Sequence, residues 1–171
     1  MPERKTIERA RKDRREGKAP STQAGEFVRE EMDHIREGRH GARSTKQAIA
    51  IGLSKARRAG VKLAPPKKGE ATERTRRSAE RAIEAGKRGK HTVSRTRSRA
   101  VEGALEREGH SAASKSSLAR QARAAARRRS AADRSAAAKK AARTKGPSER
   151  SAAARKAART RARNRSRTRR S

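Results

Sequence analysis

The sequence lacks cysteine, tryptophan and tyrosine, and Phe27 is the single aromatic residue among 171. The lack of cysteine excludes a disulfide framework, a thiolate zinc site and a cysteine nucleophile. Single-strand and RNA-recognition modules stack bases on Phe, Tyr or Trp, and the position of Phe27 on an apolar stripe predicts a core role instead. Side chains suited to reading base edges are also scarce. If the chain binds nucleic acid, its composition therefore favours sequence-independent contact with the phosphate backbone over reading of the bases. It also favours double-stranded over single-stranded nucleic acid.

Large apolar side chains are few as well. The chain holds 35 alanines but only 5 Ile, 4 Val, 4 Leu, 2 Met and Phe27. These can build one or two small helical cores, but not the core of a domain of about 150 residues. The N-terminal basic residues are not followed by an apolar run, so we expect no signal peptide. With no long apolar stretch to span a membrane, we expect a cytoplasmic protein.

Acidic residues number 18 against 51 Lys and Arg, which gives a formal net charge of +33. The imbalance grows along the chain: residues 1–69 hold 19 basic and 9 acidic residues, residues 70–110 hold 11 and 7, and residues 111–171 hold 21 and 2. Such a chain usually binds nucleic acid, because pairing with phosphates releases counterions. A membrane-surface helix would need a hydrophobic face, and the C-terminal segment offers only alanine. We therefore expect no membrane binding.

Helical periodicity predicts an all-α fold, with a small helical module at residues 1–64. Its helices are expected at about 3–16, 26–37 and 45–59, and a Pro/Lys linker follows at 65–69. The third helix has the clearest signals. Ser44 and Gln47 fit a capping box, Ile49 and Leu53 recur at helical spacing, and Gly60 is suited to end the helix.

A second helix-turn-helix-like unit is expected at residues 70–110, with helices at about 71–85 and 94–108. Its turn Ile83-x-x-Gly86-Lys-Arg-Gly resembles Ile35-x-x-Gly38-Arg-His-Gly, and its second helix repeats an Ala-(Ile/Val)-x-x-x-Leu pattern. We interpret the two halves as a divergent duplication. Chance similarity between low-complexity helical sequences is the alternative.

Residues 111–171 form an Ala/Arg-rich basic tail that contains a clear tandem repeat. The segments SAAAKKAART (135–144) and SAAARKAART (151–160) are nearly identical at an offset of 16 residues, and Gly146-Pro147 lies between them. Alanine and arginine favour helices. Closely spaced cations oppose a helix that has no packing partner. We therefore expect a tail that is largely disordered alone, or conditionally helical when phosphates screen it.

The sequence offers little with which to build a catalytic or metal site. His34 lies among Glu30, Glu31, Asp33 and Glu37, but the simplest interpretation is a solvated helix face with pairs one turn apart. A two-histidine metal site from His34 and His40 would lack a further ligand in the sequence pattern. His91 and His110 lie in predicted loops. We therefore expect no enzyme activity, no metal, no cofactor and no small-molecule ligand.

One pattern allows two interpretations. Ala48-x-x-x-Gly52-Leu53 is compatible with the turn of a DNA-binding helix-turn-helix, where Lys55, Arg57 and Arg58 would open the recognition helix. That motif expects an aliphatic residue at the position of Arg58. The preferred interpretation is one unbroken helix, in which Gly52 lets a neighbouring helix approach closely.

The segment 25–60 resembles a family of small basic bacterial proteins with the motif S-x-K-Q-A-I-A-I-G-L-S-x-A-R, present here at Ser44–Arg57. Some members carry the label of plasmid stabilisation protein. The resemblance implies a bacterial source and no catalytic residue. The tail is similar in composition to the C-termini of histone H1-like bacterial proteins, although arginine greatly outnumbers lysine here.

The leading hypothesis is a sequence-independent DNA-binding protein, associated with the nucleoid or a plasmid, that acts by neutralising phosphates. An RNA- or ribosome-associated protein is the first alternative, and a plasmid-maintenance module that binds a protein partner through residues 21–60 is the second. The basic residues predicted to contact nucleic acid are Lys46, Lys55, Arg57, Arg58, Arg127, Arg128, Arg129, Lys139, Lys140, Arg143, Arg155, Lys156, Arg159, Arg161, Arg163, Arg165, Arg167, Arg169 and Arg170.

Overall fold

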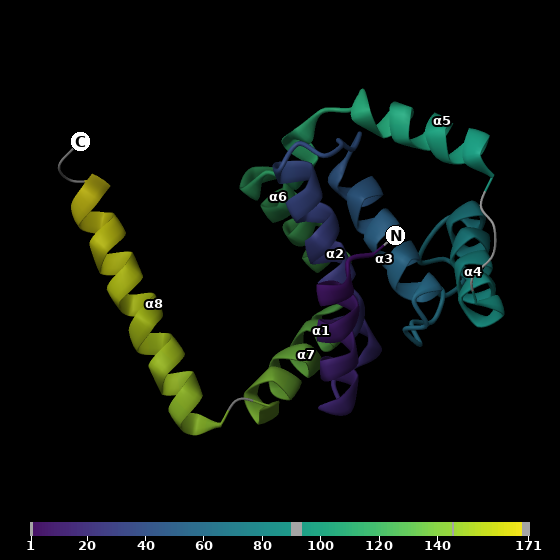
Figure 1. Ribbon diagram of the computed structural model, residues 1–171. Helices are drawn as coiled ribbons and strands as arrows, with labels where there is room; N and C mark the ends of the chain where they lie inside the picture. The colour runs from purple at the N-terminus through teal and green to yellow at the C-terminus, as the bar shows by residue number, and fades with distance from the viewer. Residues whose placement is uncertain (1, 90–93, 145, 169–171) are drawn as a thin grey trace. The chain divides into compact units, whose positions relative to one another are not determined.

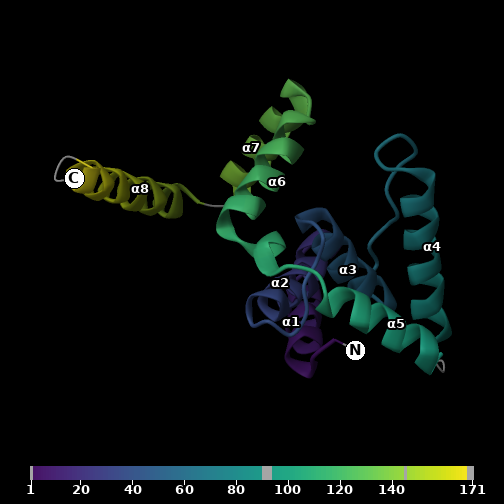
Figure 2. The ribbon, with the colours of Figure 1, turned by 90° about the horizontal axis from the view of Figure 1, so that it is seen from above.

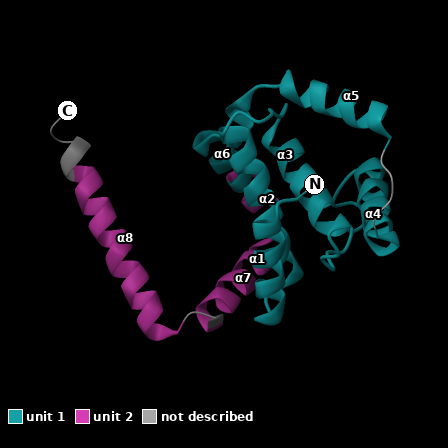
Figure 3. Ribbon diagram, viewed as in Figure 1, with its two compact units in different colours: residues 1–122 teal, residues 123–171 magenta. Residues whose placement is uncertain are grey.

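The computed structural model describes residues 2–89, 94–144 and 146–168, and this part of the chain is helical without a β-sheet, which confirms the predicted all-α class (Figure 1). The helices are α1 (Arg4–Arg15), α2 (Pro20–Arg36), α3 (Thr45–Arg58), α4 (Glu73–Arg88), α5 (Arg95–Glu106), the 3-10 helix η1 (His110–Ala113), α6 (Lys115–Arg127), α7 (Ala131–Thr144) and α8 (Pro147–Thr168). The chain divides into two compact units, residues 1–122 and 123–171 (Figure 3).

Unit 1 is built around the packed pair α2 and α3, with α1 against α2 and α4 against α3 (Figure 2). The predicted capping at the start of α3 is present: the Gln47 amide donates to Ser44 Oγ over 3.2 Å. The Gln47 side chain accepts from the Arg43 amide at 2.9 Å, one residue before the position that a standard capping box uses. At the other end, the Gly60 and Val61 amides donate to the last carbonyls of the helix, and Gly60 has φ +85.

α3 runs unbroken through Gly52, which confirms the preferred interpretation over a helix-turn-helix. A Cβ atom on Gly52 would lie 2.7 Å from Val28 Cα and 3.0 Å from the Phe27 carbonyl oxygen. Glycine is therefore required because the backbones of α2 and α3 meet at this point.

Two small apolar clusters hold unit 1 together. Phe27, 1% exposed, packs with three buried alanines between α1, α2 and α3. Ile35, fully buried, packs with Met32, Ala48 and residues from further along the chain. The position of Phe27 confirms its predicted core role. The size of both clusters agrees with the few large apolar side chains available.

α2 begins at Pro20, six residues before the predicted start at Glu26. Lys18-Ala19-Pro20 follows the predicted helix 3–16, where a proline is typical of a helix break. Proline is also favoured at the first position of a helix, because its missing N–H has no partner there and its φ is already helical. Pro20 therefore opens α2.

The predicted tail boundary at residue 111 differs from the structure, because residues 110–118 belong to unit 1. Ala112 and Ala113 are buried in the Ile35 cluster, and Leu118 packs against it. The Ala112 carbonyl accepts from Thr45 Oγ1 at 2.7 Å, which fixes this segment to the start of α3.

The predicted duplication is not reflected in the packing. α2 ends at Arg36 and is followed by Gly38, which has φ +76, whereas α4 continues through the corresponding Gly86. A Cβ on Gly86 would lie 2.4 Å from the Arg57 carbonyl oxygen, so Gly86 serves contact with α3. Within the described residues, α5 has no buried side chain, and α4 packs on α3 rather than on α5. Among the described residues, α4 and α5 therefore do not pack as a hairpin in the way that α2 and α3 do.

The basic tail is helical over α6, α7 and α8, so a largely disordered tail is not supported. Local signals explain the helices. Ser114 Oγ accepts from the Ser117 amide, and Ser130 Oγ accepts from the Asp133 amide at 3.0 Å. Pro147 opens α8. The intervening residues are mostly alanine and arginine, and their high helix propensity outweighs the charge repulsion that the prediction expected to prevent helix formation.

Candidate functional site

Unit 2 presents a basic helical surface. Every described side chain between residues 123 and 165 is exposed, except Ala142 and Ala157, which are half-exposed. The exposed set includes the predicted contact residues Arg127, Arg128, Arg129, Lys139, Lys140, Arg143, Arg155, Lys156, Arg159, Arg161, Arg163 and Arg165. Unit 2 holds 19 basic residues against Asp133 and Glu149. This surface is dominated by positive charge, and its apolar component is almost entirely alanine.

α8 carries its charge all around its axis. Successive residues of a helix are rotated by about 100°, so the six basic residues between 155 and 165 point in different directions. The helix has 22 residues and is therefore about 33 Å long, close to the length of one turn of B-DNA. Its only acidic residue, Glu149, lies in the first turn, where a carboxylate suits the helix dipole.

Three of the predicted contact residues lie partly or wholly outside this description. Arg169 and Arg170 lie beyond the described residues, and of Arg167 only the backbone, within α8, is described. The predicted loop position of His91 also lies outside the described residues.

The four predicted contact residues on α3 divide into two pairs. Lys46 and Arg58 are exposed and remain available to a polyanion. Lys55 is turned toward α2, where its ammonium lies 2.5 Å from Glu31 Oε2 and 3.9 Å from Glu30 Oε1. Arg57 is 8% exposed and donates to the Leu63 carbonyl at 3.3 Å and the Ala64 carbonyl at 3.1 Å.

Arg57 therefore has a structural role. Its two hydrogen bonds hold the segment 61–64 against α3, beside the Phe27 cluster that Val61 and Leu63 join. Burial lowers the pKa of the Arg57 guanidinium. Because both Lys55 and Arg57 serve contacts within unit 1, neither belongs to the nucleic-acid surface that the sequence predicted.

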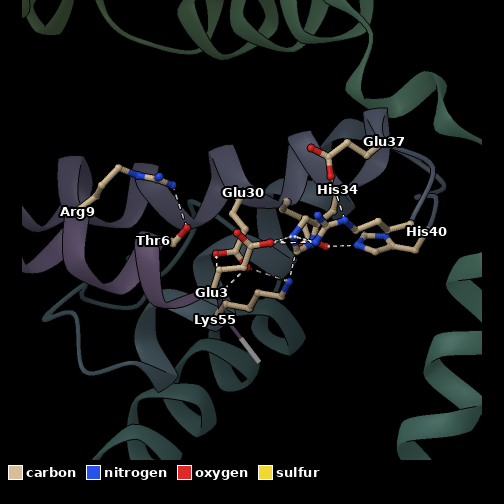
Figure 4. Close-up of polar contacts among 10 residues, drawn as sticks. Glu3, Thr6, Arg9, Glu30, His34, Glu37, His40 and Lys55 are labelled. Atoms are coloured by element: carbon tan, nitrogen blue, oxygen red, sulfur yellow. Dashed lines mark hydrogen bonds and ion pairs between the residues drawn. The ribbon is translucent and has the colours of Figure 1, made fainter.

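A buried polar cluster lies where α2, α3 and the N-terminal segment meet (Figure 4). Its centre is Glu31 on α2, an acidic side chain that is fully buried. Lys55 approaches one carboxylate oxygen, and His40 Nε2 lies 3.3 Å from the other, Oε1. Neither oxygen accepts a well-directed hydrogen bond from another described residue. Such a buried carboxylate is unusual, because buried charges need full compensation.

The N-terminal segment closes the outer side of this cluster. Glu3 Oε1 lies 3.0 Å from His34 Nε2 and accepts from Arg39 Nη1 at 2.9 Å. These two contacts lower the pKa of the Glu3 carboxyl, and the contact with His34 has the larger effect. The Glu3 backbone amide also donates to Glu30 Oε2 at 3.3 Å. Residue 3 is thereby tied to Glu30 and His34 on α2 and to Arg39 in the loop that follows α2.

The expectation of a solvated helix face around His34 is wrong for Glu30 and Glu31, which are 4% and 0% exposed. Periodicity could not show that Lys55, His40 and the N-terminal segment cover this face. The structure also brings together a group that could hold a metal ion. One ligand atom each from Glu31, His34 and His40 lies within 4.8 Å of the others. The spacing Glu31-x-x-His34 places two of these side chains one helical turn apart, and this spacing is the sequence feature that could have indicated the group.

Residues 21–60, the predicted partner-binding region, are themselves largely covered. α2 and α3 pack on each other and are contacted by α1, α4 and η1. Among the described helices, none has the length and apolar composition needed to cross a membrane.

Residues 3–68 match the model of a family of unknown function, DUF6496. This match covers α1, α2, α3 and the segment that Arg57 holds, and it includes the motif at Ser44–Arg57. No curated protein and no solved structure matches the chain.

Proposed function

We propose that this protein binds duplex DNA without sequence specificity, and that unit 2 supplies most of the affinity by neutralising phosphates. The observation that carries the proposal is α8, a helix of 22 residues with exposed cations on all sides and one acidic residue in its first turn. Each phosphate neutralised by such a cation releases counterions, which drives binding irrespective of base sequence. The site of action is the nucleoid or a plasmid.

Two features favour duplex DNA over RNA or single strands. The single aromatic residue of the chain, Phe27, is 1% exposed and cannot stack on a base. α8 has nearly the length of one duplex turn, about 33 Å, and can follow a regular phosphate backbone over that distance. Competition between duplex DNA and a structured RNA at physiological salt tests this preference. A clear preference for RNA would refute it and favour an RNA- or ribosome-associated role.

The role of α8 can be tested in the full-length chain with two variants of equal net charge. The first replaces six cations of α8 by glutamine: Arg155, Lys156, Arg159, Arg161, Arg163 and Arg165. The second replaces six exposed cations of α1 by glutamine: Arg4, Lys5, Arg11, Lys12, Arg14 and Arg15.

The readout is the slope of log K against log salt for a duplex of random sequence. Each lost phosphate contact flattens the slope by about 0.9, so the α8 variant should lose about 5 in slope and the α1 variant much less. Equal losses in the two variants would show that overall charge, and not the tail, determines binding. Circular dichroism checks that both variants keep their helices.

A further inference from the structure

In the buried cluster around Glu31, a ring nitrogen of His40 lies beside a carboxylate oxygen of Glu31. His40 Nδ1 lies 3.0 Å from the Gly41 carbonyl oxygen, which can only accept, so Nδ1 carries the hydrogen. In a neutral imidazole the other nitrogen, Nε2, then presents its lone pair. That nitrogen lies 3.3 Å from Glu31 Oε1. A lone pair facing a carboxylate oxygen is unfavourable unless a positive centre lies between them.

The charges of the cluster lead to the same requirement. Three carboxylates, of Glu3, Glu30 and Glu31, face two permanent cations, Lys55 and Arg39. The cluster therefore holds one more acidic side chain than permanently cationic ones, in a largely buried position. The rest of the chain is strongly basic, so this local excess of negative charge is unusual.

From these contacts we infer that Glu31, His34 and His40 bind a divalent transition-metal cation, with Zn²⁺ the best fit. Two histidines and one glutamate form a ligand set that Zn²⁺ accepts, and three protein ligands leave one position open. The three ligand atoms lie within 4.8 Å of one another, so a small movement of flexible side chains brings them to the spacing of a zinc site.

Two of the three ligands are already oriented, whereas His34 Nε2 faces Glu3 Oε1 at 3.0 Å and Arg39 Nη1 at 3.2 Å, so the His34 ring or these two side chains must turn when an ion binds. The hydrogen bond from His40 Nδ1 to the Gly41 carbonyl fixes the ring and directs Nε2 toward Glu31. Lys55 holds Oε2 of Glu31 and leaves Oε1 to face His40. His34 and His40 lie with their rings edge to face, 6.1 Å apart between centres, as two ligands of one ion can.

A metal ion here would join the end of α2 to the loop that follows it. That loop already carries backbone contacts to a distant segment: the Gly41 amide donates to the Leu105 carbonyl at 2.8 Å, and the Ala42 amide donates to the Gly109 carbonyl at 3.1 Å. The ion would therefore stabilise unit 1 as a whole and act apart from the tail.

The test uses the full-length protein, freed of nucleic acid by nuclease and high salt and then treated with a chelator. Titration with Co²⁺, followed by its visible absorption, should show one ion per chain in a tetrahedral or five-coordinate site. Added Zn²⁺ should displace it and raise the Tm. Mg²⁺, which prefers oxygen ligands, should do neither.

Single variants locate the ion. His40→Asn and Glu31→Gln should each weaken Co²⁺ binding by at least about 100-fold, more than the loss of an outer-shell partner causes. His110→Ala, which removes an exposed histidine on η1, should leave binding unchanged. A far-ultraviolet circular dichroism spectrum equal to that of the unaltered protein shows that a variant is folded. If His40→Asn does not fold, His34→Ala replaces it.

Absence of a stoichiometric Co²⁺ signal would overturn the inference. So would binding that survives His40→Asn or is lost with His110→Ala. A Tm that rises equally with Zn²⁺ and Mg²⁺ would also overturn it, since a general ionic effect would then be sufficient. None of these outcomes depends on DNA binding, so the metal site and the proposed function can fail separately.

Discussion

Gly52 of α3 lies directly against the backbone of Val28 in α2: a Cβ at this position would lie 2.7 Å from Val28 Cα. Because the nearest atom belongs to the backbone, no side-chain rotation can relieve the contact. We expect Gly52→Ala to lower the free energy of unfolding by about 1 kcal/mol, since overpacking costs about 1–3 kcal/mol and the helix propensity gained offsets about 1 kcal/mol of it. Urea denaturation followed by circular dichroism measures the change.

Gly103 in α5 supplies the matched control. It is also a glycine inside a helix, but the nearest atom to a Cβ there is the flexible Arg107 Nη1 at 3.6 Å, an ordinary contact. Gly103→Ala should therefore stabilise the protein locally, by up to about 1 kcal/mol. Equal effects at the two glycines would show that α2 and α3 do not approach closely.

Arg57 and Arg58 are neighbours with opposite roles, and one pair of substitutions separates them. Arg57→Met removes hydrogen bonds to two backbone carbonyls and should lower stability by about 1–3 kcal/mol without changing the affinity for DNA beyond the loss of one charge. Arg58→Met should leave the Tm nearly unchanged, because its side chain is exposed. Thermal melts and a DNA-binding titration distinguish them. A stable Arg57→Met variant with a large loss of affinity would contradict this assignment.

Phe27 tests whether aromatic stacking has any part in nucleic-acid binding. Phe27→Ala should lower stability by about 3–5 kcal/mol, because it empties the centre of the apolar cluster between α1, α2 and α3. Phe27→Leu keeps most of the volume and should cost much less. The Leu variant, measured where it is folded, should bind DNA as tightly as the unaltered chain. Weaker binding by a fully folded Leu variant would indicate a direct contact.

The corner between α1 and α2 should respond to acid. Lys18 Nζ lies 2.8 Å from Glu16 Oε2, and this contact lowers the pKa of Glu16 below 4.5. A carboxyl whose pKa is lower in the folded state contributes stability above its unfolded pKa, and loses that contribution as the pH falls through the folded value. Glu16→Gln should therefore lower the Tm slightly at pH 7.

The difference in Tm between Glu16→Gln and the unaltered protein should vanish in more acidic solution, below the folded pKa of Glu16. Glu8→Gln, on an exposed side chain of α1, serves as the control for the loss of one charge. A difference that persists unchanged in acid would show that Glu16 acts by something other than its charge.

The parts of the fold that depend on local signals were predictable. Ser44 and Gly60 mark the two ends of α3, and an apolar stripe through Phe27 identifies the core. Both signals could be read because caps and periodicity act within a few residues. The predicted start of α2 was wrong because Lys-Ala-Pro can both end one helix and open the next.

The parts that depend on distant contacts were not predictable. In sequence, Lys55 and Arg58 are equivalent cations in the last turns of one helix, yet Lys55 faces Glu31 and Arg58 faces outward. Likewise, nothing near Glu31 reveals that Lys55 of α3 and His40 of the 38–43 loop contact it. Burial of a charge is decided by the arrangement of whole helices, which periodicity does not report.

The docking of η1 bears on how independent the first helices are. The family match ends at residue 68, where the Phe27 cluster is already complete. The Ile35 cluster is not, because Ala112, Ala113 and Leu118 lie more than forty residues further along the chain. A polypeptide that ends at residue 68 would keep the Phe27 cluster intact and would expose the apolar side chains of the Ile35 cluster to solvent. Any shorter protein built on these three helices must cover Met32 and Ile35 with other apolar residues, either from its own chain or from a second molecule.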